Sequence, residues 1–441
     1  MEAAGYEALN MNPEISIVIA AYNAAHYLPK LLAALDSQSS DWPIEVILVD
    51  DGSSDETADV FAKWRPTSLN LEKILITLHQ NKGQGAARNQ GIEVSRGPWI
   101  TFPDADDYIS SNYLHSNELF LREQADSNVV AVANYLVHYQ EWTRKVLDNH
   151  PRRSLFKHDE ILSIQVNPYL QNYFANSAAM FFRRELIEKT GLRFNTKLKP
   201  NFEDGDFSAR YFLNNPGIVV FNGTTRYFYR SRRNQTSSVQ NMWLDPRKYD
   251  LVPNAYLDLL KYSLEYYEEV PAWIQALILS ELTPYSNNIR RIPHLNDSSG
   301  NSLQDTFRSR IEEISKYLHV DVLHSYRLGA LSWKARSFLE SQKYFSKNDS
   351  WNSKFVAEVR TDHHSQSIEY ELHFSGDPPD LRVNGVEILS SPLVLWSKVV
   401  TYQVFPGCFL NTLRISIPND IAASFQVGTD NIEFLDSLNI F

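Results

Sequence analysis

Cysteine is almost absent from this sequence, since Cys408 is the only one in 441 residues. A single thiol excludes an intrachain disulfide framework and any zinc cluster that needs several cysteines. We therefore expect a chain that works in a reducing compartment, with Cys408 as a small buried apolar residue.

Long apolar runs are absent as well. No run approaches the ~20 residues that a membrane-spanning helix needs, and residues 1–12 lack the basic start and apolar centre of a secretory signal. These absences predict a cytoplasmic protein, either free or at the inner face of the membrane, whose association with a membrane is at most peripheral.

Basic charge is in short supply. The 42 Lys and Arg face 53 Asp and Glu, for a net charge of -11, which argues against a nucleic acid partner because that partner needs a basic face. A hydrophobic content of 43% is ordinary for a globular chain. The length exceeds what one core usually holds, so two or three domains are expected.

The first hundred residues alternate between short β-branched runs and amphipathic segments. We expect strands at 15–20, 44–49, 73–78 and 99–102. Helices are expected at 26–35 and 56–64, and residues 81–89 open a third helix. This alternation predicts an α/β domain with a mainly parallel sheet and helices on both faces.

Polar residues follow the end of each of these strands: Tyr22, Asp51, Asn81 and Asp104. Ligands of such sheets bind beyond the carboxyl ends of the strands, so the four segments should converge on one crevice. A dinucleotide site is disfavoured, because Arg88 stands where the third glycine of that fingerprint belongs.

Three carboxylates follow the fourth strand. Asp104 and Asp106 are one residue apart on extended backbone, so they can share one hard divalent cation. The structural alternative is that aspartates are common in turns and that Asp107 simply starts the helix expected at 113–125.

The pattern changes twice further along the chain. Strands are expected at 129–139 and 178–182, a strand pair at 217–221 and 225–229, and a helix at 203–213. Long amphipathic helices follow, such as 256–267 and 273–282, and then alternating strands from about residue 355 that suggest a small β-sandwich. The predicted domains are 1–242, 243–345 and 346–441.

Five ordered motifs give residues 1–241 their resemblance to a known family. They are Ile17-Val-Ile-Ala-Ala-Tyr-Asn23, Val49-Asp-Asp-Gly-Ser-Ser-Asp55, Asn81-Lys-Gly-Gln-Gly-Ala-Ala-Arg-Asn89, Phe102-Pro-Asp-Ala-Asp-Asp107 and Phe202-Glu-Asp204. Together they are similar to the inverting family-2 glycosyltransferases of GT-A fold. Ala21 departs from the proline that the family often has there, which leaves the donor open.

The resemblance implies a site for a UDP-sugar donor. Asp51 would accept from the uracil imide N–H and Tyr22 would stack on the ring, as the chemistry of a flat base with one donor edge suggests. The other implied donor-site residues are Ala21, Asn23, Asn81, Arg88, Asp104, Ala105, Arg233 and Ser237. The last two belong to a basic, hydroxylated loop suited to closing over the diphosphate, together with Arg230, Arg232, Thr236 and Ser238.

The resemblance also implies the catalytic groups. Asp104 and Asp106 would hold Mn²⁺ or Mg²⁺ against the diphosphate. Asp204 would take the proton of the acceptor hydroxyl, and Glu203 would position the acceptor or Asp204. The structural alternative for the last pair is favourable charge in a first helical turn.

The domain layout resembles transferases that decorate wall teichoic acid or build teichoic-acid or capsular polymers. That layout implies a polysaccharide or teichoic-acid-like acceptor and a homo-oligomer formed through residues 346–441. The leading expectation is thus a hexosyltransferase that moves an N-acetylhexosamine or hexose.

Two other functions stay open. A carbohydrate-binding or scaffold protein with a vestigial transferase domain would keep the fold, but the intact carboxylates speak against it. Nucleotidyl transfer to a sugar phosphate would call for a glycine-rich basic loop after the first strand, where this chain has Tyr22-Asn-Ala-Ala25.

Overall fold

The chain forms two compact units, Met1–Met242 with Glu265–Tyr267, and Trp243–Leu264 with Glu268–Phe441. Whether the helical and β-rich parts of the second unit are separate domains stays a prediction. Within the part of the chain described below, no helix is both long and apolar enough to cross a membrane. The computed structural model describes residues 12–67, 70–123, 128–150, 153–156, 161–165, 176–232, 242–289, 302–327, 331–343, 355–374, 377–427 and 430–435.

The first unit is built on a ten-stranded sheet in the order β3-β2-β1-β4-β9-β6-β10-β5, with β7 added to β6 and β8 to β10. Its strands are β1 Ile15–Ala21, β2 Ile44–Asp50, β3 Leu71–Thr77, β4 Trp99–Thr101, β5 Tyr108–Ile109, β6 Val129–Gln140, β7 Lys145–Leu147, β8 Ile161–Gln165, β9 Met180–Arg183 and β10 Ile218–Ser231. The first four strands pair in parallel, as expected, and every residue of β2 is buried.

The rest of the sheet is mixed. β9 lies antiparallel between β4 and β6, and β5 and β8 pair antiparallel with β10. The GT-A-like α/β architecture is therefore confirmed, with a larger antiparallel part than the alternation of strands and helices indicates.

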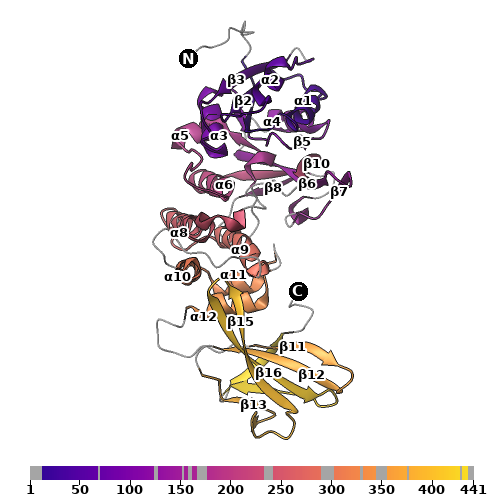
Figure 1. Ribbon diagram of the computed structural model, residues 1–441, viewed down its shortest axis with the longest axis vertical. Helices are drawn as coiled ribbons and strands as arrows, with labels where there is room; N and C mark the ends of the chain where they lie inside the picture. The colour runs from indigo at the N-terminus through magenta and orange to yellow at the C-terminus, as the bar shows by residue number, and fades with distance from the viewer. Residues whose placement is uncertain are drawn as a thin grey trace. The chain divides into compact units, whose positions relative to one another are not determined.

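Helices cover both faces of this sheet. They are α1 Leu28–Asp36, α2 Thr57–Lys63, α3 Gln84–Val94, α4 Tyr113–Glu123, α5 Arg184–Thr190 and α6 Glu203–Asn214, with single 3-10 turns at Arg153–Leu155 and Ser177–Ala179. Successive residues of a strand point to opposite faces. Phe181 of β9 packs on Tyr113 of α4, whereas Phe182 packs on Phe207 of α6, so α4 and α6 lie on opposite sides (Figure 1).

Helix α3 lies unusually close to the sheet. A Cβ added to Gly91 would be 2.2 Å from Cγ1 of Val18 in β1, so only glycine permits this approach. Arg88, one turn earlier on the same helix, is thereby held at 1% exposure.

The prediction of a strand pair at 217–221 and 225–229 is wrong, because both segments belong to the single strand β10. Its pairing with β6 shifts register between Asn222 and Tyr227. Within that irregularity the backbone N–H of Thr224 donates to Oδ1 of Asn222 over 3.0 Å, and Thr225 Oγ1 donates to Asn134 of β6. These hydrogen bonds pair polar groups within the irregularity, and the chain continues in the same direction instead of turning back as a second strand.

The second unit begins with helices and ends in strands. The helices are α8 Leu251–Ser263, α9 Ala272–Asn287, α10 Leu303–Ser315, α11 Val320–Ser325 and α12 Trp333–Ser341, preceded by 3-10 turns at Met242–Leu244 and Pro246–Tyr249. The strands are β11 Phe355–Asp362, β12 Ser367–Phe374, β13 Leu381–Val383, β14 Val386–Glu387, β15 Trp396–Phe405, β16 Cys408–Pro418, β17 Phe425–Val427 and β18 Asp430–Leu435.

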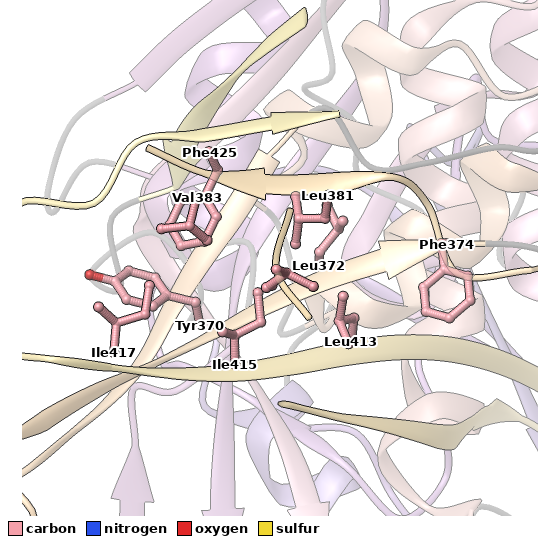
Figure 2. Close-up of a cluster of buried hydrophobic side chains, with 10 residues drawn as sticks. Tyr370, Leu372, Phe374, Leu381, Val383, Leu413, Ile415, Ile417 and Phe425 are labelled. Atoms are coloured by element: carbon pink, nitrogen blue, oxygen red, sulfur yellow. The ribbon is translucent and has the colours of Figure 1, made fainter. Parts of the chain in front are cut away.

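These strands pair in the order β14-β13-β17-β18-β11-β12-β16-β15 and enclose an apolar core. Figure 2 shows alternate residues of β12 and β16, such as Leu372 and Ile415, facing Leu381 and Val383 of β13. Alternate residues that face one core are the pattern of a β-sandwich, as expected. The other face of β12 is buried as well, because His373 stacks on Trp333 of α12 and Glu371 pairs with Lys334 of the same helix. Cys408 is buried, as the sequence also indicates.

Candidate active site

Loops after β1 and β2 are tied to each other. The backbone N–H of Asn23 donates to Oγ of Ser53 over 2.9 Å, and Oδ1 of Asn23 accepts from the N–H of Ser54 over 2.9 Å. Asn23 has a φ of 48°, a conformation that asparagine tolerates better than most residues. The preceding Tyr22 is 50% exposed, so one face of its ring is open to a flat ligand.

Asp51 links the loop after β2 to the loop after β3. Its two carboxylate oxygens accept from the backbone N–H groups of Lys82 (2.8 Å) and Gly83 (2.7 Å). A carboxylate has about four lone-pair sites, so Asp51 can accept one further hydrogen bond. Asn81, in the same loop, is exposed.

Arg88 joins carboxylates from two distant segments. Nη2 donates to Oδ1 of Asp104 over 2.7 Å, and Nη1 donates to Oδ1 of Asp204 over 2.5 Å. Nη1 also lies 3.9 Å from Oε1 of Glu203. Burial alone would lower the pKa of Arg88, but the three carboxylates raise it above its ordinary value. The guanidinium is therefore a permanent cation at the centre of the site.

The three aspartates after β4 differ in their partners. Asp104 is ion-paired with Arg88, and Asp106 is ion-paired with Arg232. Oδ1 of Asp107 accepts a hydrogen bond from the backbone N–H of Arg230 over 2.8 Å. Burial raises the pKa of Asp104 to about 6, against the pull of Arg88. Burial and then Asp106 raise the pKa of Asp107 well above its usual value. Negative charge is in excess here.

Asp107 does not start the following helix, contrary to the structural alternative. Helix α4 begins at Tyr113, and the short strand β5 lies between them. Asp107 is 1% exposed and faces β10 through Arg230 instead. Asp107 therefore lies with the other two aspartates and does not cap α4.

Glu203 and Asp204 open helix α6. The residue before them, Phe202, has a φ of 84°, and its ring lies against Gly205, where a Cβ would be 2.7 Å from Cε2. Gln84 of α3 donates to Glu203. Burial and then the neighbouring Asp204 raise the pKa of Glu203 to about 7. Asp204 keeps 25% of its side chain exposed, so a substrate can reach it.

A divalent cation would find two carboxylates here. The side chains of Asp104 and Asp106 are 30% and 26% exposed. Among the described residues no group of three or more His, Cys, Asp or Glu is placed to hold a metal. Mg²⁺ commonly takes only one or two carboxylates and fills its shell with phosphate oxygens and water. The donor set therefore fits a metal bound together with a diphosphate.

The predicted site residues on described segments lie after β1, β2, β3 and β4 and on α3 and α6. Ala21 and Ala105 are buried beside Tyr22 and Asp104 in the chain. Arg233 and Ser237 lie outside the described residues. The structure adds three residues that the sequence did not assign to a role: Gln84, Asp107 and Tyr227. The hydroxyl of Tyr227 accepts from the backbone N–H of Asp104. Arg230 and Arg232, predicted to lie in the loop over the diphosphate, contact Asp107 and Asp106.

A comparison with known families matches residues 16–191 to the model described as glycosyl transferase family 2. These residues belong to glycosyl transferase family 2. The matched segment includes β1, Asp51, α3 and the three aspartates after β4. Glu203 and Asp204 lie beyond it.

Two relatives of this chain come from Bacillus subtilis (strain 168). The EpsH protein is 31% identical over 230 residues, which is 49% of this chain and 61% of EpsH. The minor teichoic acid biosynthesis protein GgaA is 30% identical over 273 residues, which is 60% of this chain and 58% of GgaA. The chain thus matches about six tenths of the length of these curated relatives.

Solved structures of TarS from Staphylococcus aureus share the fold. Full TarS superposes with a TM-score of 0.54 at 16% identity, over 96% of this chain and 77% of TarS. TarS 1–349 in complex with UDP-GlcNAc gives 0.55 at 20% identity, over 75% of this chain and 87% of that one. The family 2 domain, the helices and the C-terminal β-sheets therefore form a known architecture.

Proposed function

We propose that this chain is an inverting, metal-dependent glycosyltransferase that moves a sugar from a UDP donor to a hydroxyl group of a surface polysaccharide or teichoic-acid-like acceptor. The observation that carries the proposal is the ion network in which Arg88 joins Asp104 to Asp204. That network brings a predicted metal ligand and the predicted base within reach of one guanidinium.

The donor is assigned from the loops at the strand ends. Asp51 would accept from the imide N–H of uracil, and the exposed ring of Tyr22 would stack on the base. The TarS structure with bound UDP-GlcNAc supports a UDP donor, and with it an N-acetylhexosamine or a hexose as the transferred sugar.

Asp104 and Asp106 would hold Mn²⁺ or Mg²⁺. The bound cation neutralises the negative charge that develops on the departing UDP. Burial and the neighbouring carboxylates raise the pKa values of Asp104 and Asp107, so an added cation would stabilise their charged forms. Asp104 can approach it without losing Arg88, since a carboxylate has a second oxygen.

Asp204 would act as the general base. The acceptor oxygen forms a bond to the anomeric carbon while the bond from that carbon to the diphosphate breaks, and the electron pair leaves with UDP. The hydroxyl proton passes to Asp204. Attack from the face opposite the nucleotide inverts the anomeric centre. Glu203, held by Gln84, would position Asp204 or the acceptor.

The acceptor class rests on the relatives. GgaA is named for minor teichoic acid biosynthesis, and TarS as a poly(ribitol-phosphate) β-N-acetylglucosaminyltransferase. Both names point to polymers rich in phosphate and hydroxyl groups. We propose an acceptor of that kind, and we assign the C-terminal β-rich part to oligomerisation or glycan contact.

Turnover with UDP-sugars tests the proposal. The chain is incubated with UDP-GlcNAc or UDP-glucose, Mn²⁺ and a poly(ribitol phosphate) acceptor, and UDP release is followed. Asp204→Asn should still bind UDP by calorimetry but lose transfer by about 10²- to 10⁴-fold. Asp104→Ala should lose the dependence on Mn²⁺. Asp305→Asn, on the surface of α10, is the charge-matched control.

The outcomes separate the parts of the proposal. Full transfer by Asp204→Asn would remove Asp204 as the base. Absence of UDP release from every UDP-sugar, with or without acceptor, would remove the enzymatic function and favour a binding or scaffold protein.

A further inference from the structure

Arg232 is the cation that neutralises Asp106 in the structure, and it lies one residue beyond the end of β10. Its guanidinium sits over the ring of Tyr27, 4.2 Å from the centroid. The guanidinium contacts only Oδ2 of Asp106, so a divalent cation that binds this oxygen must displace it. The predicted metal ligand therefore already has a positive partner.

Arg230, two residues earlier, is held far more firmly. Its backbone N–H donates to Asp107, its Nε donates to the carbonyl oxygen of Asp106 over 2.6 Å, and its Nη1 donates to Glu141 over 3.0 Å. Arg230 is 7% exposed and anchors the end of β10. The side chain of Arg232 is ion-paired with Asp106 alone among the described carboxylates, so it is the arginine that can move.

The position of Arg232 leaves one of its donors unsatisfied. Its Nε is buried and finds no hydrogen-bond partner among the residues that the structure describes. A buried N–H without a partner is costly. Nη2 of Arg230 is in the same state, so what distinguishes Arg232 is that its side chain has fewer bonds to hold it in place. A planar guanidinium with free donors is well matched to phosphate oxygens, which accept in the same fork geometry.

We propose that Arg232 is an exchangeable counter-ion for Asp106: it pairs with the carboxylate until a divalent cation and a diphosphate bind, and then moves onto the diphosphate. The inference rests on the proposed function, because it needs a metal-diphosphate ligand. Tyr27 provides the surface on which the guanidinium changes partners, since a cation over an aromatic face keeps favourable contact. No net charge is stranded in either state.

Metal binding in the absence of nucleotide tests the first half of the exchange, the displacement of Arg232 from Asp106 by the cation. Free Mn²⁺ is measured by electron paramagnetic resonance during titration of the full chain. Arg232→Gln should bind Mn²⁺ alone about three- to tenfold more tightly than the unaltered chain, because the competing cation is gone. Arg232→Lys keeps the charge and should stay close to the unaltered chain, as should the surface control Arg308→Gln.

UDP binding at saturating Mg²⁺ tests the second half. Arg232→Gln should bind UDP about tenfold more weakly, because the fork that meets the diphosphate is lost. Thermal unfolding of each variant checks that it is folded, and Arg232→Lys supplies the second reading if Arg232→Gln does not fold.

Three results would overturn the exchange. Equal Mn²⁺ affinity of Arg232→Gln and the unaltered chain, with binding lost in Asp106→Asn, would refute it and leave the metal site intact. Unchanged or tighter UDP binding by Arg232→Gln would refute the move onto the diphosphate. Absence of Mn²⁺ binding by every variant, with and without UDP, would refute both the exchange and the metal dependence of the proposed function.

Discussion

Arg88 and Asp204 are 116 positions apart in the sequence, and a hydrogen bond of 2.5 Å joins Nη1 of one to Oδ1 of the other. The bond ties helix α3 to the first turn of helix α6. The loop before α3, which Asp51 holds through Lys82 and Gly83, is therefore linked to Asp204, the proposed general base.

Replacing Arg88 should destabilise the first unit. Arg88→Met leaves Asp104, Asp204 and Glu203 without their shared cation. Because Asp104 and Asp204 keep 30% and 25% of their side chains exposed, water takes up part of the charge. We expect a loss of about 2–3 kcal/mol in the free energy of unfolding, below the range for fully buried pairs.

Urea denaturation followed by circular dichroism measures this loss. Arg308→Met on the surface of α10 is the matched control and should lower the free energy by less than about 0.5 kcal/mol. Equal midpoints for the two variants would show that Arg88 does not hold the two helices together.

Glu203 should make stability fall as pH rises. Burial and Asp204 raise its pKa from 4.5 to about 7 in the folded chain, so between those values the folded state binds more protons than the unfolded state. The contribution is fully present below pH 4.5 and is lost as pH rises through 7. The slope is at most about 1.4 kcal/mol per pH unit for one proton.

Glu203→Gln should remove this slope. Free energies of unfolding are compared across the window for the unaltered chain, for Glu203→Gln and for Glu265→Gln, an exposed residue that should leave the slope unchanged. A slope in Glu203→Gln as steep as in the unaltered chain would assign the titration to other groups.

Gly205 should reverse the usual effect of alanine in a helix. Alanine normally stabilises a helix interior by about 1 kcal/mol over glycine. Here its Cβ would lie 2.7 Å from Cε2 of Phe202, so the ring or the helix must shift. Gly205→Ala should cost about 1–3 kcal/mol and should reduce UDP release, since Asp204 is the preceding residue.

Adding Phe202→Leu tests the cause. The smaller side chain makes room for the new Cβ, so the double variant should recover part of the stability lost in Gly205→Ala. A double variant less stable than the sum of the two single effects would contradict a simple steric conflict.

Leu372 should report on the β-sandwich. It is fully buried in the cluster of Figure 2, and Leu372→Ala should cost about 2–5 kcal/mol. Leu389 is 87% exposed in the same unit, so Leu389→Ala should cost less than about 0.5 kcal/mol. Thermal unfolding of the two variants measures the difference, and equal losses would place Leu372 outside the core.

Local pattern predicted much of the fold. β1 and β2 are continuous apolar runs because both faces of a central strand are covered, and α1 buries Leu28, Leu31, Leu32 and Leu35 at helical spacing. The β-sandwich followed from alternation in the same way. The roles proposed for Asp51, Asp104 and Asp204 stay predictions, although the structure brings their segments together.

The parts that escaped prediction depend on pairing between distant segments. Nothing local to residues 180–183 says that β9 runs antiparallel between β4 and β6. Gln84 and Glu203 are 119 positions apart, and Arg232 and Asp106 are 126 apart. Their contacts follow from strand order. The sequence placed Arg230 and Arg232 in a loop over the diphosphate, but nothing in it indicated that Arg232 pairs with Asp106.

Gly91 sets how deeply α3 is seated, because a single methyl group there would collide with Val18. Any side chain at this position would lift the helix from the sheet and carry Arg88 away with it. Gly91 would thus govern whether the carboxylates of the site are aligned, although it would touch neither donor nor acceptor. Replacing Gly91 by any other residue should therefore reduce turnover.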